Sequence, residues 1–94
     1  MSYELRFLKV AKKEWDALDA AVQRQLKRKL AERLEAPHVP AARLRGTRNR
    51  YKIKLRASGY RLVYEVRESD VVVLVVAVGK RDRGAVYRAA SARD

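Results

Sequence analysis

Three basic residues in a predicted β-hairpin have the types and spacing needed to hold a phosphate group. Apolar and basic residues alternate through 51–56, and after a turn at 56–59 an alternation of apolar with other residues resumes from Tyr60. When apolar residues pair across this hairpin, Leu55 faces Tyr60, and Lys54 therefore faces Arg61, with Lys52 on the same side. Like charges opposite one another destabilise paired strands. Unless these long side chains simply spread into solvent, the cluster is expected to hold an anion.

Residues beyond the hairpin are expected to enlarge this basic cluster. Pairing Val66 with Val71 brings the third strand back so that Lys80 and Arg81 emerge at the hairpin tip. Tyr87 follows within one or two helical turns. Two interpretations of Tyr87 fit the pattern equally, packing in the core and lying over the basic face.

Lysine, arginine and tyrosine in one cluster suit cleavage of an RNA phosphodiester. Neighbouring cations lower the pKa of a lysine and make it available for proton transfer. Arginine donates two parallel hydrogen bonds to a phosphate and stabilises added negative charge. The ribose 2′-hydroxyl supplies the nucleophile, so this chemistry requires no metal ion or other cofactor. A surface that only binds phosphates fits the same pattern.

The elements that position the cluster follow from the hydrophobic periodicity. Residues 3–7 alternate as a strand, residues from Val10 to Leu18 form a helix, and a second helix with N-cap Asp19 buries a residue every fourth position before the proline-containing segment from Ala36. The hairpin follows, and then the apolar run from Val71 predicts a central strand covered on both faces. Asp82 is expected to cap a short terminal helix.

Composition defines the class of protein. The chain has 94 residues, a formal net charge of +12 and no cysteine, and its single histidine, His38, lies in a predicted loop. This charge indicates a polyanionic partner. The absence of cysteine excludes a disulfide framework and a thiolate metal site, and the single histidine cannot form a metal site alone. We expect one α+β domain over residues 1–94, located in the cytoplasm because no export signal or apolar span is present.

The segments RLRGTRNRYKIKLRASGYRLVYEV and VVVLVVAVGKRDRGAVY, with KKEWDAL and QLKRKLAERLEAP upstream, resemble RelE-type toxins of type II toxin–antitoxin systems. The resemblance covers nearly the whole chain. It implies a small four-stranded, mostly antiparallel sheet with an N-terminal helical hairpin and a short C-terminal helix. It also implies metal-independent cleavage of messenger RNA in the ribosomal A site, which leaves a 2′,3′-cyclic phosphate.

The resemblance implies roles for individual residues. Lys54 and Arg81 would assist proton transfer and leaving-group departure, Lys52 and Arg61 would stabilise the phosphorane, and Tyr87 would stack on or orient a base. Which residue is the general acid or base stays open. RNA-binding positions would be Arg45, Lys27, Arg28, Lys29, Arg56 and Lys80. The implied partners are the ribosome and a RelB-like antitoxin that displaces the terminal helix, and the free toxin would be a monomer.

Two alternative functions compete with this hypothesis. A ParE-type toxin shares the fold but inhibits DNA gyrase, and that class lacks the combination of Lys52, Lys54, Arg61, Arg81 and Tyr87. A non-enzymatic RNA-binding module would need only the positive charge.

Overall fold

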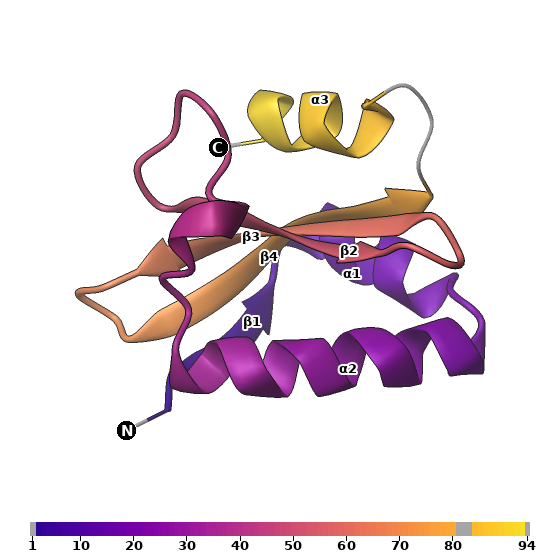
Figure 1. Ribbon diagram of the computed structural model, residues 1–94, viewed down its shortest axis with the longest axis horizontal. Helices are drawn as coiled ribbons and strands as arrows, with labels where there is room; N and C mark the ends of the chain where they lie inside the picture. Colours follow the sequence, from indigo (N-terminus) through magenta and orange to yellow (C-terminus); the bar gives the residue numbers. More distant parts are fainter. Residues whose placement is uncertain (1, 81–83, 94) are drawn as a thin grey trace.

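The computed structural model describes residues 2–80 and 84–93 as two layers of helix around one sheet (Figure 1). A short 3-10 helix, Pro40–Ala42, precedes the hairpin. The other elements, in chain order, are β1 (Glu4–Phe7), α1 (Lys9–Asp16), α2 (Ala20–Glu35), β2 (Arg50–Leu55), β3 (Tyr60–Arg67), β4 (Val72–Lys80) and α3 (Ala85–Ala92). The predicted α+β class and element order are confirmed. No helix in the described part of the chain is long and apolar enough to cross a membrane.

The four strands form one mixed sheet in the order β1-β4-β3-β2. The β2–β3 and β3–β4 pairs are antiparallel, whereas β1 lies parallel to β4. The helices α1 and α2 cover one face of the sheet, and α3 lies on the opposite face (Figure 1). Residues from Val72 to Val78 are all buried, as expected for a central strand between two layers.

The main core lies between the sheet and the helical hairpin. From α2 it takes the stripe of Val22, Leu26 and Leu30, spaced four residues apart on one face of the helix. Asp19 occupies the N-cap of α2 as predicted, although its side chain makes no capping hydrogen bond. On the hairpin, Ile53 is among the buried residues that meet this stripe. The apolar half of the hairpin is therefore fixed against α2.

A smaller core holds α3 on the other face, where Val86 and Ala90 pack against β3 and β4. A glycine permits this close approach, because a Cβ added at Gly79 would lie 3.1 Å from Val86 Cγ2. The N-cap of α3 is Gly84, with φ 76° in the left-handed region that favours glycine. Gly84 therefore occupies the N-cap position that we expected for Asp82, and Asp82 itself lies outside the described residues.

Two predictions about strand pairing have different outcomes. The β2–β3 register is confirmed, with Lys54 opposite Arg61 and Leu55 opposite Tyr60. The β3–β4 register is wrong, because Val66 pairs with Val73 and not with Val71. Arg67 extends β3 by one residue, so the turn occupies the next four residues, and a bulge between Val63 and Tyr64 shifts the register again toward the hairpin tip.

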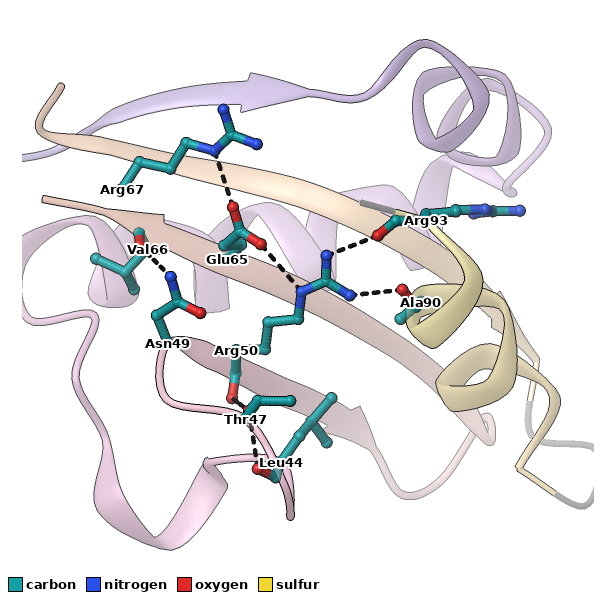
Figure 2. Close-up of polar contacts among 9 residues, drawn as sticks. All are labelled: Leu44, Thr47, Asn49, Arg50, Glu65, Val66, Arg67, Ala90 and Arg93. Carbon is teal, nitrogen blue, oxygen red and sulfur yellow. Dashed lines mark hydrogen bonds and ion pairs between the residues drawn. The ribbon is translucent and has the colours of Figure 1, made fainter. Parts of the chain in front are cut away.

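Arginine side chains hold the C-terminal end of α3 to the sheet (Figure 2). Arg50 on β2 donates to the Ala90 carbonyl at 2.5 Å and to the Arg93 carbonyl at 2.6 Å, two carbonyls at the end of the helix. Its Nε donates to Glu65 at 3.0 Å, and the second oxygen of Glu65 accepts a hydrogen bond from Arg67. A cation at this position also interacts favourably with the helix dipole.

A second contact ties Arg93 to α1. Its guanidinium donates to both carboxylate oxygens of Glu14, at 2.8 and 3.0 Å, and the Val78 backbone N–H also donates to Glu14. Burial raises the pKa of Glu14, but these hydrogen bonds outweigh it and hold the pKa below its ordinary value. We call Arg50, Glu65, Arg93 and Glu14 the α3 clamp.

Replacing Leu26 with Ala should destabilise the protein by about 3 kcal/mol, because Leu26 is fully buried between α2 and the sheet. Urea unfolding followed by circular dichroism measures this cost. The exposed neighbour Lys27→Ala is the matched control and should change the free energy of unfolding by less than about 0.5 kcal/mol. A similar cost for both variants would contradict the placement of the core.

Replacing Glu14 with Gln should cost about 1–2 kcal/mol at neutral pH, since it weakens charge-assisted hydrogen bonds of the α3 clamp. The folded-state pKa of Glu14 is lowered, so its contribution exists above the unfolded pKa and disappears as pH falls through the folded value. Thermal unfolding of parent and variant should therefore converge in acid. Asp16→Asn, at an exposed ion pair with Lys12, should have little effect at any pH. A gap that persists in acid would refute the role given to the Glu14 carboxylate.

Candidate active site

Alternation along the hairpin places the predicted basic residues on the face that α3 covers in part. Lys54 lies directly opposite Arg61, and Lys52 lies opposite Val63, a buried residue of the small core under α3. The apolar residues on the other side of the hairpin are buried in the main core, which fixes the basic side chains on the opposite side of the strands. Burial of Ile53 and Leu62 is thus what brings Lys52, Lys54 and Arg61 together.

Mutual repulsion defines the electrostatics of this cluster. Lys52 lowers the pKa of the Lys54 amine, with further lowering from desolvation and from Arg61 and Arg56. Lys54 is exposed, so it can meet a substrate, whereas Arg61 is only 8% exposed. Arg61 donates to the Tyr60 carbonyl at 3.3 Å, and no ion pair of Arg61 is present within the described residues. The cluster therefore keeps charge available for an anion.

Tyr87 lies on α3 at one wall of a pocket of about 310 Å³ beside this cluster. Lys52, Arg45 and Arg50 also line the pocket. The Tyr87 side chain packs against the small core, and its hydroxyl is buried without a hydrogen-bond partner among the described residues. Both interpretations from the sequence hold in part, because the residue contacts the core and also borders the basic face.

The remaining predicted residues separate into different surfaces. Arg45 is exposed and lines the Tyr87 pocket, while Lys29 and Arg56 line a groove that also contains Lys54. Lys27 and Arg28 are exposed on α2, and Lys27 is about 200° around the helix from Lys29 at 3.6 residues per turn. One continuous surface therefore cannot use all three helix residues equally.

Lys80 does reach the hairpin tip but does not join the cluster. It pairs with Tyr60, and its ammonium lies 6.0 Å from the centre of that ring. Arg61 pairs with Gly79, so the two-residue period places Lys80 on the opposite face of the sheet. The prediction that Lys80 enlarges the cluster is wrong for this reason. Arg81 lies outside the described residues.

The sequence interpretation missed two arginines near the site. Arg50 has the same parity on β2 as Lys52 and Lys54, and continuing the predicted register by two pairs beyond Lys52 places it opposite Glu65. The predicted register therefore already paired Arg50 with Glu65, two members of the α3 clamp. Arg33 borders Lys52 and Lys54 from α2, and its spacing of four residues from Lys29 indicated a shared helix face. Within the described ranges, no three acidic or histidine side chains converge as metal ligands do.

Comparisons with known proteins agree with this fold and site. The family model described as ParE toxin of the type II toxin–antitoxin system parDE matches residues 5–84. The mRNA interferase toxin RelE of Escherichia coli strain K12 is 54% identical over 93 residues, which cover 99% of this chain and 98% of that protein.

Two solved structures are similar over most of their length. The isolated RelE toxin of E. coli has a TM-score of 0.85 at 52% identity, with 97% of each chain covered. The toxin in the intact E. coli RelBE toxin–antitoxin complex has a TM-score of 0.84 at 54% identity, with 87% of this chain and 100% of that chain covered. By sequence and by fold, this chain therefore belongs to the RelE/ParE superfamily of type II toxins and is a RelE-type member of it.

Proposed function

We propose that this protein is an endoribonuclease toxin that cleaves messenger RNA in the ribosomal A site and so inhibits translation. The observation that carries this proposal is the cross-strand pair of Lys54 and Arg61 beside Lys52, on a face where Lys54 has a lowered pKa. A relative that is 54% identical over nearly the whole chain is named an mRNA interferase, which supports the same substrate.

The chemistry follows from the positions of these side chains. The ribose 2′-hydroxyl attacks the adjacent phosphorus and gives up its proton, while the 5′-oxygen of the next nucleotide leaves and gains one. The products are a 2′,3′-cyclic phosphate and a 5′-hydroxyl. Lys54, whose amine loses its proton more readily than an isolated lysine, assists proton transfer together with Arg81. Lys52 and Arg61 stabilise the negative charge of the phosphorane.

Tyr87 orients the substrate in this proposal and takes no part in bond making. Its ring borders the pocket that contains Lys52 and Arg45, where a base next to the scissile phosphate could stack. Arg45 adds a cation on the same side and Arg56 one beside Lys54, and both hold backbone phosphates. Lys27, Arg28, Lys29 and Lys80 contribute further attraction for RNA.

The ribosome is expected to supply the in-line geometry that this cluster does not enforce. Orientation of reacting groups is worth several kcal/mol in favourable cases. We also propose that the toxin acts in the cytoplasm as a monomer until a RelB-like antitoxin neutralises it. The solved RelBE complex of a relative supports that partner. The basic face predicts that the antitoxin contributes acidic residues.

Arg61→Ala should reduce messenger cleavage on ribosomes by on the order of a hundredfold or more, because loss of one transition-state cation commonly costs about 3 kcal/mol. Primer extension on programmed ribosomes maps the breaks, and purified messenger without ribosomes should be cut poorly. Lys13→Ala, an exposed cation on α1, is the control for net charge. Unfolding curves of the variant check that removing the nearly buried Arg61 leaves the fold intact. Gyrase inhibition without messenger cleavage by the parent would overturn the proposal.

Lys52→Gln should raise the pKa of Lys54, since Lys52 is the largest cause of its lowering. If the neutral Lys54 amine accepts the proton, cleavage should rise with pH through this pKa, and the variant's rise should move to higher pH. Single-turnover cleavage across a pH series measures the midpoint, and ¹³C NMR of the lysine Cε carbons measures the pKa directly. Loss of Lys52 as a phosphate-binding charge should lower the maximal cleavage rate, and this effect by itself does not move the midpoint. If the pKa of Lys54 measured by NMR rises in the variant but the kinetic midpoint does not move, Lys54 is not the titrating base.

A further inference from the structure

A second basic groove runs from the active face around the free edge of β2. One part of it, about 360 Å³ in volume, is lined by Arg33, Lys52, Lys54 and Arg56. The other part, also about 360 Å³, is lined by Gln25, Lys29, Lys54 and Arg56 together with Leu55 and Ala57. Both parts border Lys54 and Arg56, so they lie side by side between α2 and β2. We call the two parts together the edge groove.

Two regular elements supply the polar side chains of the edge groove at matched intervals. Gln25, Lys29 and Arg33 are four residues apart on α2, which corresponds to a rise of about 6 Å per step. On the other wall, basic side chains at every second residue from Lys52 to Arg56 are about 6.6 Å apart. Polar side chains therefore repeat along both walls with nearly the same period, and Lys29 and Arg33 are the cations on the α2 wall.

Arg33, which lines the first part of this groove, is held in place by several contacts. Its Nη1 donates to the Lys52 carbonyl at 3.1 Å and to the Tyr64 hydroxyl at 2.9 Å, and its guanidinium lies 5.7 Å from the centre of the Tyr64 ring. Tyr64 is fully buried and donates in turn to the Pro37 carbonyl at 2.7 Å. Burial raises the pKa of Tyr64 although Arg33 opposes it, so the hydroxyl stays neutral.

The charge of Arg33 is thus positioned without being neutralised. The partners of its guanidinium among the described residues are a carbonyl, a hydroxyl and a ring, and none is a carboxylate. Acidic residues are also missing from the described lining of both parts of the groove. A phosphate suits this arginine well, because the guanidinium is fixed in place, keeps its charge and can donate paired hydrogen bonds to phosphate oxygens.

We propose that the edge groove binds the sugar–phosphate backbone of the messenger next to the scissile bond, with Arg33 as its anchor. The inference rests on the proposed function, because it assumes that the scissile phosphate lies at Lys54 and Arg61. Lys52 and Lys54 border both places, so a strand cleaved at the cluster continues directly into the groove. A cationic groove that follows the backbone is the usual device for holding single strands without reading sequence.

The occupant is RNA and not an acidic peptide, because the apolar residues beside Arg33 are small and Leu55, in the other part of the groove, is already buried in the main core. Alanines and Val39 make up the apolar wall beside Arg33, and a peptide interface normally needs a larger buried centre. Antitoxin binding in the edge groove is therefore an outcome for experiment to exclude.

The test measures binding of a single-stranded RNA whose riboses are all 2′-O-methylated, so that cleavage cannot occur. Fluorescence anisotropy across a salt series gives the slope of log affinity against log salt, to which each phosphate contact on a single strand contributes about 0.7. Arg33→Gln and Lys29→Gln should each reduce the slope by about that amount. Lys13→Gln makes the same charge change on α1 and should leave the slope unchanged.

Kinetics on programmed ribosomes separates binding from a structural effect. Arg33→Gln should raise the toxin concentration needed for half-maximal cleavage and leave the single-turnover rate at saturation unchanged. Lys29 is exposed, so Lys29→Gln should leave the fold intact. This variant therefore keeps the proposal testable even when Arg33→Gln fails to fold.

Each other outcome overturns a distinct statement. Unchanged salt slopes in both variants, with normal cleavage by the parent, would exclude the edge groove and leave the proposed function standing. Loss of antitoxin affinity without loss of RNA affinity would assign the groove to a peptide. A parent that binds RNA with the expected slopes but cuts no messenger on ribosomes would refute the function and not the groove.

Discussion

The β2–β3 pairing is the constraint on which the active face depends. Burial of Ile53, Leu55 and Leu62 against the helical hairpin fixes the register, and that register leaves Lys54 no position except opposite Arg61. In an isolated hairpin, a change of register would relieve the repulsion between Lys54 and Arg61. Burial of the apolar side chains in the core offsets this repulsion and holds the register. A slip by one residue would move every apolar side chain of the strand to solvent, which makes the charged arrangement stable without an ion bound to it.

Arginines that hold α3 to the sheet also neutralise acidic side chains of the fold. Glu65 lies on the same side of the hairpin as Lys52, but Arg50 and Arg67 occupy its two oxygens. Glu14 is similarly engaged by Arg93. Neutralising Glu65 in particular removes a carboxylate from the face that carries Lys52, so Arg50 and Arg67 preserve the positive potential of the basic cluster.

Much of the fold was predictable because its pattern is local. The stripe on α2, the alternation in the hairpin and the apolar run of β4 each specify an element within a few residues. The β3–β4 register was not predictable, because a bulge at Val63 and an extra strand residue at Arg67 depend on packing between distant segments. The same holds for the site. Parity alone grouped Lys52, Lys54 and Arg61, whereas the place of Arg33 depends on how α2 lies against β2, which no periodicity encodes.

The parallel pairing of β1 with β4 has a consequence for synthesis of the chain. Glu4 pairs with Val72, and Glu14 is held by Arg93, so residues near the N-terminus form these contacts only after residues much later in the chain have been synthesised. Such distant contacts slow folding, because a long loop must close before they form. The hairpin that carries the basic cluster cannot pair with β4 until the residues of β4 have left the ribosome. A nascent toxin is therefore an incomplete enzyme during most of its own translation.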